Sequence, residues 1–285
     1  MPDAHVIADA SRRSAAEGVQ PESARLSRPL RVAILGSTGS IGRSTLEVAA
    51  ASAGRLRPWL LAACRSTQRL VEQAKACGPA WVVVTDEQAA TDEVLKELPA
   101  GTRLAIGQDA LCELVQAPEV DRVVSAIVGA AGLASTWAAL EAAKTVALAN
   151  KETLVMAGPL VMQLAARQGV AVLPVDSEHS AIMQALRAGA ASEVRRLLLT
   201  ASGGPFRTLP ADQFGAVTPE QALAHPTWAM GPKITIDSAT MMNKGLEIIE
   251  AAHLFRLPEE RIDVLVHPQS IVHSLVSYRD GSVLA

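Results

Sequence analysis

The chain contains 285 residues, a length that at about 150 residues per domain indicates about two domains and excludes a disulfide-stapled miniprotein. Apolar residues make up 49% of the sequence and charged residues 19%, so the chain can bury a sizeable core and does not have the composition of a disordered protein. The 26 basic and 29 acidic side chains nearly balance, which excludes nucleic-acid binding driven by overall charge.

Three further features of the sequence restrict the compartment and the kind of protein. Cys64, Cys77 and Cys112 are an odd number without C-x-x-C spacing, which argues against a disulfide framework or a structural zinc site and favours a reducing compartment, the cytoplasm. No apolar run approaches the roughly 20 residues of a membrane span, so we expect no membrane segment. Residues 1–29 mix arginines with acidic residues and lack the apolar core of a secretory signal, so we predict a disordered tail there.

Residues 30–175 alternate between short apolar runs and Ala-rich helical stretches. This alternation is typical of βαβ units and predicts a Rossmann-like, doubly wound domain on a parallel sheet. Helices are predicted at Thr67–Ala76, Glu87–Leu98 and Ala131–Ala143. The predicted strands are Arg31–Leu35, Trp59–Ala63, Trp81–Thr85, Arg103–Ile106, Arg122–Val128, Thr145–Ala149 and Val170–Val175.

After Pro174 the pattern changes, and we predict a second α/β domain over residues 176–285. Its predicted elements are strands at Arg196–Thr200, Lys233–Asp237 and Ile262–Val266, a helix at Met241–Phe255 and a hairpin around Asp280-Gly281. About 30 residues rich in Gly, Pro and Thr separate the first two strands, and loops of that length are usually functional. The second arm of the hairpin stops at Ala285, which suggests a truncated sequence.

The first candidate site is the turn Gly36-Ser37-Thr38-Gly39-Ser40-Ile41-Gly42, between the first predicted strand and a helix that begins near Ser40. Glycines let the backbone approach a pyrophosphate, whose charge then meets the amides at the helix N-terminus. At the end of the second predicted strand, where NAD enzymes usually have an acid, the chain has Arg65 and Ser66. A guanidinium there favours NADPH over NADH. The structural alternatives are a tight turn without a ligand and a solvated surface arginine.

Three carboxylates form the second candidate site. Asp176 and Glu178 follow an apolar strand, at the sheet edge where α/β folds bind ligands. Glu247 lies on a predicted helix whose neighbouring residues are apolar. Oxygen ligands suit Mg²⁺ or Mn²⁺ better than zinc. The alternatives are a helix N-cap with a first-turn acid for the first two residues and a solvent-facing acid for the third.

Polar and glycine-rich segments around these carboxylates suggest an anion site. Ser238, Asn243 and Lys244 can hydrogen-bond and neutralise a phosphate. The segment Ala201–Arg207 resembles a Gly-rich anion nest, and the loop 225–232, with Trp228, could close over a ligand. Both segments could instead simply make turns.

Together these motifs resemble one family, 1-deoxy-D-xylulose-5-phosphate reductoisomerase, from Val32 to Ala285. The motifs occur in family order at Gly36–Gly42, Ala147–Glu152, Val175–His179, Ser202–Arg207, His225–Trp228, Asp237–Glu247 and His267–His273. The resemblance implies conversion of 1-deoxy-D-xylulose 5-phosphate to 2-C-methyl-D-erythritol 4-phosphate in the non-mevalonate isoprenoid pathway, by carbon rearrangement and then hydride transfer. It also implies a homodimer, and a family C-terminal helical domain that is absent from this chain.

The same resemblance assigns roles to individual residues. NADPH would be held by Gly36, Ser37, Thr38, Gly39, Ser40, Ile41, Arg65, Ser66, Gly129, Asn150, Glu152 and Gly231. The ligands of Mg²⁺ or Mn²⁺ would be Asp176, Glu178 and Glu247. The phosphorylated sugar would contact Lys151, Ser177, Ser202, His225, Trp228, Ser238, Asn243 and Lys244. The implied catalytic residues are Lys151, Glu178, His179, His225, Glu247 and His273.

Two other functions are weighed against this one. An NADP-dependent aspartate-semialdehyde dehydrogenase would share the glycine turn but needs a nucleophilic thiol. Cys64 lies at the expected 2′-phosphate position, and Cys77 and Cys112 lie in expected helices, so this function has no candidate nucleophile. An NADPH-binding module without turnover is the second alternative, suggested by the absent C-terminal domain.

Overall fold

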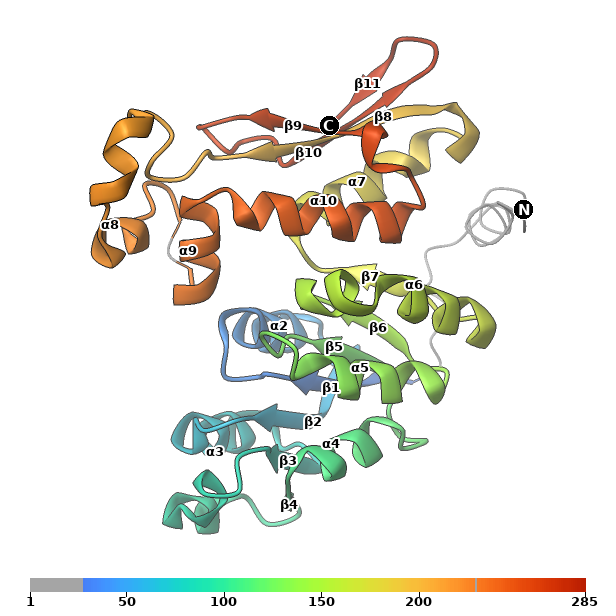
Figure 1. Cartoon of the computed structure of the whole chain (residues 1–285). Coiled ribbons are helices and arrows are strands. Elements are labelled where there is room, and N and C mark those ends of the chain that lie inside the picture. Colours follow the sequence, from blue (N-terminus) through green and yellow to red (C-terminus); the bar gives the residue numbers. More distant parts are fainter. Residues whose placement is uncertain (1–27, 229) are drawn as a thin grey trace. The chain divides into compact units, whose positions relative to one another are not determined.

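The computed structural model describes residues 28–228 and 230–285 (Figure 1). The chain divides into two units, the first ending at Leu173 and the second running from Pro174 to Ala285. The predicted tail concerns mainly residues 1–27, which lie outside the described residues. Arg28 is described, and its guanidinium donates two hydrogen bonds of 2.7 Å to the Asp121 carboxylate. This pair, with desolvation opposing it, lowers the pKa of Asp121.

The first unit is a seven-stranded parallel sheet with the strand order β4-β3-β2-β1-β5-β6-β7, which confirms the predicted doubly wound fold. Helices lie on both faces of the sheet, as right-handed crossovers require, and α4, α5 and α6 lie side by side (Figure 1). Its strands are β1 (Leu30–Leu35), β2 (Leu56–Ala63), β3 (Trp81–Val84), β4 (Arg103–Ile106), β5 (Arg122–Ser125), β6 (Thr145–Leu148) and β7 (Val172–Pro174). Its helices are α2 (Ser40–Ala51), α3 (Thr67–Cys77), α4 (Gln108–Val115), α5 (Gly132–Glu141) and α6 (Lys151–Gln168), with short 3₁₀ turns at Ala89–Thr91 and Glu93–Glu97.

The strand order reverses between β1 and β5, and the loops that follow these strands approach each other closely. Gly36, directly after β1, has a φ of +80°, and a Cβ there would lie 2.5 Å from the Ala126 carbonyl oxygen after β5. A Cβ on Gly42 would clash with the backbone of Gly36 and Ser37. The glycines therefore allow the turn, the start of α2 and the β5 loop to pack together at the switch point, where doubly wound folds bind ligands.

The second unit is a four-stranded sheet with the order β11-β10-β8-β9, in which β8 pairs antiparallel with β10 and parallel with β9. Its strands are β8 (Val194–Ala201), β9 (Ile262–Val266), β10 (Ser274–Tyr278) and β11 (Val283–Leu284). Its helices are α7 (Ser177–Ala185), α8 (Pro219–Leu223), α9 (Pro232–Ala239) and α10 (Met242–Phe255), with 3₁₀ turns at Leu186–Ala188, Ala191–Glu193, Ala211–Ala216 and Glu259–Arg261. The expected hairpin around Asp280-Gly281 is confirmed by β10 and β11.

Helices α7 and α10 pack against this sheet through one apolar cluster. Ile182 of α7 and Ala251 of α10 are fully buried beside Leu197 and Leu199 of β8 and Val276 of β10. The cluster fixes which faces of the two helices are turned inward. Polar residues on those same faces are consequently buried as well.

The predicted strand at Lys233–Asp237 is wrong, because this segment belongs to helix α9. The β-branched run Ile234-Thr235-Ile236 favours a strand in isolation. Three local features favour the helix instead: a proline at its first position, a 2.8 Å hydrogen bond from the Thr235 hydroxyl to the Gly231 carbonyl, and an ion pair between Lys233 and Asp237 at i,i+4 spacing.

Three further predicted elements are shorter or broken in the structure. The helix expected at Glu87–Leu98 is two 3₁₀ turns, because Asp92 has an extended backbone and caps the second turn. The strand expected at Arg122–Val128 ends at Ser125, where the loop after β5 begins. The strand expected at Val170–Val175 is confined to Val172–Pro174. Within the described residues, no helix is long and apolar enough to cross a membrane.

The close approach at Gly36 leads to a stability prediction. Gly36 and Gly54 have the same φ of +80°, but a Cβ on Gly54 would meet nothing within 4 Å. Gly54→Ala therefore introduces only backbone strain, about 1–2 kcal/mol, whereas Gly36→Ala adds a backbone clash worth about 1–3 kcal/mol more. Urea unfolding of the two variants measures the difference, and equal losses of unfolding free energy would contradict the packing described for the turn.

Candidate functional site

The glycine turn of the first unit is held in place by its own backbone and by α3. The amides of Gly36 and Ser37 both donate to the Ala62 carbonyl at the end of β2, at 2.9 Å. Ser37 is fully buried, and its hydroxyl donates to the Gln73 side chain, whose amide donates back to the Ser37 carbonyl. The Ser37 side chain therefore positions the turn. Gln73 carries no motif signal in the sequence, and only the tertiary structure shows its role.

The start of helix α2 is the part of the turn suited to an anion. Gly39 is the N-cap residue, and no side chain caps the helix. Its first-turn amides, including those of Ser40 and Ile41, have no partner within the helix itself. The partial positive charge of a helix N-terminus attracts phosphate.

Two arginines lie near this turn, one of which the motif analysis missed. Arg65 follows β2, is 80% exposed and forms an ion pair of 2.6 Å with Asp86. This hydrogen bond raises the pKa of Arg65, while bonds from the Ala89 amide and then from Arg65 lower the pKa of Asp86. Arg69 of α3 donates to the Thr38 carbonyl at 3.2 Å. Ser66, also expected at the cofactor, is the N-cap residue of α3.

Asn150 ties the loop after β5 to the start of α6. Its side-chain amide donates to the carbonyls of Ile127 and Gly129, at 2.5 and 2.9 Å, and its Oδ1 accepts from Thr153. Asn150 also bonds Glu152 at 3.1 Å. Asn150 therefore shapes the loop that contains Gly129. Lys151, the first residue of α6, is buried.

Two of the three thiols do not resemble an activated nucleophile. Burial raises the pKa of the Cys77 thiol to about 11 and also raises the pKa of Cys112. Cys64 is exposed. A catalytic thiol needs the opposite shift, because the thiolate is the nucleophile.

In the second unit, the three predicted metal ligands come together. One carboxylate oxygen from each of Asp176, Glu178 and Glu247 can be chosen so that all three lie within 4.8 Å of one another. Asp176 is the N-cap residue of α7 and Glu178 lies in its first turn, whereas Glu247 comes from α10 and is 1% exposed. The packing of α7 and α10 thus brings together acids that are about 70 positions apart in the chain.

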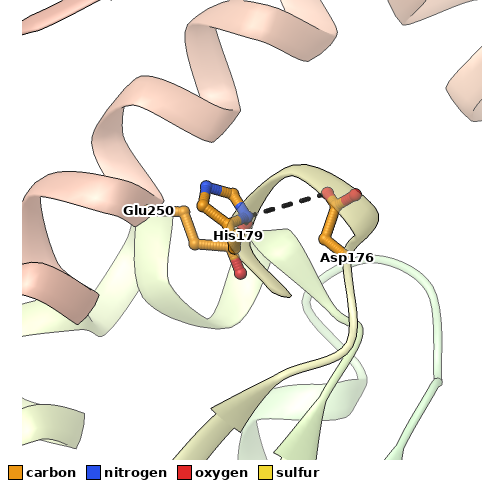
Figure 2. Close-up of side chains that lie close together, drawn as sticks. All are labelled: Asp176, His179 and Glu250. Atoms are coloured by element: carbon orange, nitrogen blue, oxygen red, sulfur yellow. Dashed lines mark ion pairs between the residues drawn. The ribbon is translucent and has the colours of Figure 1, made fainter. Parts of the chain in front are cut away.

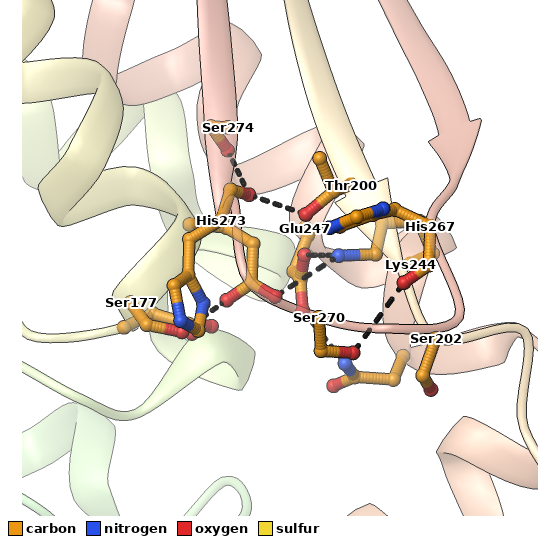
Figure 3. A network of polar contacts seen from close by, with 12 residues as sticks. Ser177, Thr200, Ser202, Lys244, Glu247, His267, Ser270, His273 and Ser274 are labelled. Atoms are coloured by element: carbon orange, nitrogen blue, oxygen red, sulfur yellow. Dashed lines mark hydrogen bonds and ion pairs between the residues drawn. The ribbon is translucent and has the colours of Figure 1, made fainter. Parts of the chain in front are cut away.

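Lys244 and Asn243 hold the carboxylate of Glu247. The Lys244 ammonium is buried, forms an ion pair with Glu247 and lies 3.5 Å from Glu178 (Figure 3). The Asn243 amide donates to Glu247 at 2.6 Å, while its own Oδ1 is buried without a hydrogen-bond partner among the described residues. Both residues, predicted to bind phosphate, are therefore in contact with a predicted metal ligand.

A second acid on α10, which the sequence analysis did not single out, lies beside this cluster. Glu250 is 1% exposed, and its carboxylate lies 3.3 Å from Nδ1 of His179. The same nitrogen is 3.9 Å from Asp176 (Figure 2). The spacing of three residues from Glu247, on one face of an otherwise apolar helix, was the available signal. Ser177 donates to Glu178 at 2.5 Å.

The loop after β8 folds onto the end of α9. Gly203 and Gly204 have positive φ angles, and a Cβ on Gly204 would lie 2.6 Å from the Ser238 carbonyl oxygen. Only glycine permits this approach, which brings Ser202 and Ser238, both predicted to bind phosphate, to neighbouring backbone segments. The Arg207 guanidinium donates back to the Ser202 carbonyl at 2.9 Å.

His225 connects this loop to the segment that contains Trp228. The amides of Thr227 and Trp228 donate to its Nδ1, at 3.1 and 3.0 Å. Nδ1 is therefore the acceptor, and in the neutral ring Nε2 carries the hydrogen and donates to the Ser202 hydroxyl at 3.0 Å. Burial lowers the pKa of His225. The Trp228 ring is 46% exposed and lies 6.4 Å from the ring of His273. Gly231 is the N-cap residue of α9.

The chain is similar in sequence to one enzyme family. Residues 32–158 match the family described as 1-deoxy-D-xylulose 5-phosphate reductoisomerase, and residues 172–255 match its C-terminal domain. The reductoisomerase of Pseudomonas aeruginosa strain PAO1 is 52% identical over 91% of this chain and 67% of its own length. That of Desulfosudis oleivorans is 55% identical over 90% of this chain and 67% of its own length. The chain thus spans about two thirds of the length of these relatives.

Solved structures give the same result. A DOX-P reductoisomerase in complex with NADPH, fosmidomycin and magnesium superposes with a TM-score of 0.83 at 44% identity, over 90% of this chain and 65% of that one. The reductoisomerase of Zymomonas mobilis in complex with NADPH has a TM-score of 0.83 at 47% identity, over 90% of this chain and 66% of that one.

The hydrogen bonds of His225 predict a pH-dependent loop. Protonation at Nδ1 would remove the acceptor of the Thr227 and Trp228 amides. Because the folded pKa lies below the ordinary 6.5, the stabilisation of the loop is complete above that pH and decreases as the pH falls below it. We expect the Trp228 fluorescence, taken as the difference from Trp228→Phe, to change over this range. His225→Gln should abolish the change and His253→Gln should keep it; a pH-independent Trp228 signal would contradict the assignment.

Proposed function

Because the chain belongs to the 1-deoxy-D-xylulose 5-phosphate reductoisomerase family, we propose that it carries the activity of that family. The proposed reaction converts 1-deoxy-D-xylulose 5-phosphate to 2-C-methyl-D-erythritol 4-phosphate, with NADPH and Mg²⁺ or Mn²⁺, in isoprenoid precursor biosynthesis. The observation that carries the proposal is the cluster of Asp176, Glu178 and Glu247. Asn243 and Lys244, whose side chains can also bind phosphate, contact this cluster at Glu247.

The first unit fits NADPH. The uncapped N-terminus of α2 lies at the switch point of the sheet, beside glycines whose backbone permits close approach. Arg65 stands where a 2′-phosphate requires a cation, and its exposed guanidinium can leave Asp86, since an exposed ion pair is worth only about 0–1 kcal/mol. When bound, NADPH supplies the hydride for the reduction. The chain's own contribution is to hold the phosphates and to orient the cofactor.

The second unit fits a divalent ion. Three carboxylates from two helices offer the oxygen ligands that Mg²⁺ and Mn²⁺ prefer. When bound, the ion would act as a Lewis acid that polarises the substrate carbonyl. Lys244 and Asn243 keep the Glu247 carboxylate at the cluster. The buried Lys244 and the half-buried Asn243 can also donate to a substrate phosphate.

Other residues of the second unit would bind and enclose the substrate. Ser202 presents a hydroxyl whose orientation is set by the hydrogen on Nε2 of His225. The same imidazole orders the segment of Trp228, which could cover the substrate and exclude water. Binding of the phosphate, which is remote from the reacting carbons, would help to orient those carbons. Ser177 and His273 complete this set.

The alternatives weighed from the sequence find less support. An NADPH-binding module without turnover is not favoured, because the similarity to the family includes residues 172–255 as well as the nucleotide-binding part. A thiol-dependent dehydrogenase is not favoured either, because burial raises the pKa of Cys77 and Cys112 instead of lowering it.

We also propose a homodimer in the cytoplasm. Strand β9 is an edge strand of the described sheet, and three consecutive apolar residues on it, Val264, Leu265 and Val266, are exposed. An exposed apolar edge strand favours pairing with another chain. Free thiols at Cys64, Cys77 and Cys112 are compatible with a reducing compartment. Sedimentation equilibrium measures the mass, and a monomer at micromolar concentration would contradict the dimer.

The activity is tested by NADPH oxidation, followed by absorbance, with 1-deoxy-D-xylulose 5-phosphate and Mg²⁺. We expect turnover that chelation of the metal abolishes. Glu247→Gln removes a ligand charge and should lower turnover at least about 100-fold with NADPH affinity nearly unchanged, because that residue lies in the other unit. The control Glu260→Gln replaces an exposed acid outside the cluster and should behave as the wild type. Unchanged turnover in Glu247→Gln would overturn the metal assignment.

Cofactor preference is tested at Arg65. Arg65→Ala should weaken NADPH binding about 10- to 100-fold, because a charge-assisted contact to phosphate is worth about 1.5–3 kcal/mol, and should change NADH binding little. Arg57→Ala is the matched control, since Arg57 is exposed on the same strand β2. Fluorescence titration with both nucleotides gives the ratio, and an equal loss for NADPH and NADH would contradict a role in reading the 2′-phosphate.

A further inference from the structure

His179 is held at both ring nitrogens by residues of α10. It lies in the first turn of α7 and is fully buried. Its Nε2 lies 2.9 Å from the backbone carbonyl of Glu247. A carbonyl only accepts, so Nε2 carries a hydrogen and donates it. Its Nδ1 lies 3.3 Å from the Glu250 carboxylate (Figure 2).

The buried face of α10 explains how this contact arises. The face contains Lys244, Glu247 and Glu250 at intervals of three, and then the apolar Ala251 and Leu254. A carboxylate at 1% exposure has lost its hydration, which costs several kcal/mol unless a partner compensates it. The imidazole of His179 lies beside the Glu250 carboxylate. The centroid of this imidazole ring is 6.3 Å from that of the Phe255 ring, which also belongs to α10.

The imidazole is close in sequence to two of the three carboxylates of the proposed metal site. Asp176 and Glu178 lie within three residues of His179, at the N-terminus of α7, and Glu247 provides both the third carboxylate and the carbonyl that accepts from Nε2. The contact between His179 and α10 therefore links the start of α7, which bears two of the ligands, to the part of α10 that bears the third. The apolar cluster that includes Ile182 and Ala251 packs the two helices together beside this contact.

We infer that Glu250 is a positioning residue, which acts through Nδ1 of His179 to hold Asp176 and Glu178 at the spacing from Glu247 that a divalent ion requires. The inference deepens the proposed function and rests on it. Residues that orient the ligands of a metal typically contribute about 10- to 100-fold to metal affinity. Glu250 therefore affects the metal site without being one of its ligands.

The test is the affinity of the full chain for Mn²⁺ alone, measured by electron paramagnetic resonance titration, with NADPH affinity and thermal unfolding measured in parallel. Glu250→Ala should weaken Mn²⁺ binding about 10- to 100-fold at unchanged stoichiometry, with NADPH affinity within about twofold of the wild type. Glu250→Gln keeps the size of the side chain, so it can be measured even if Glu250→Ala does not fold. It should show a smaller loss in the same direction. His253→Gln, on the same helix, is the control that should bind Mn²⁺ normally.

A double-mutant cycle separates positioning from direct ligation. A glutamine amide can replace Nε2 of His179 but offers nothing in the place of Nδ1, so His179→Gln should weaken Mn²⁺ binding as much as Glu250→Ala. The double variant should lose no more than either single variant. Additive losses would mean that Glu250 binds the metal itself and would overturn the inference, as would unchanged affinity in Glu250→Ala and Glu250→Gln. A wild-type chain that binds NADPH but not Mn²⁺ would overturn the proposed metal site and the inference with it.

Discussion

Four carboxylates lie close together: Asp176 and Glu178 at the start of α7, and Glu247 and Glu250 on the buried face of α10. Their like charges repel unless cations and hydrogen-bond donors compensate them. In the described structure the Lys244 ammonium, the Asn243 amide and the ring of His179 provide this compensation. Apolar packing on the four-stranded sheet brings the helices together, and we infer that the polar contacts adjust the separation of their carboxylates. The proposed metal chemistry depends on that separation.

In the first unit the dominant constraint is the approach of backbone to backbone. Glycine at positions 36 and 42 lets the turn after β1 pack against the loop after β5 and against the start of α2. Ser37 and Asn150, expected to bind the cofactor, use their side chains to hold these loops in place. The surface that remains for a dinucleotide is mainly the helix N-terminus and the arginines near it. We propose that main-chain groups of these loops hold an anion there, together with the nearby arginine side chains.

Much of the fold and of the site could be predicted from local pattern. The alternation of apolar runs and helical stretches predicted the doubly wound sheet. Two acids after a strand and a third on a helix with apolar neighbours predicted the cluster of Asp176, Glu178 and Glu247. Local pattern failed at residues 233–237, where β-branched residues favour a strand but a proline start and an i,i+4 ion pair stabilise a helix. It also missed Gln73 and Glu250, whose importance lies in partners 36 and 71 positions away.

The sequence by itself determined the elements, the glycine turn and the chemical types of the site residues, because these depend on neighbours within a few positions along the chain. Only the tertiary structure decided which of those side chains form hydrogen bonds or ion pairs with other residues of the chain. Lys244 pairs with Glu178 across the two helices, Ser37 with Gln73, and His179 with Glu250. Such pairings follow from how α7 and α10, or the β1 turn and α3, pack together. No periodicity encodes them, because burial makes an unpaired polar group costly only once the helices have met.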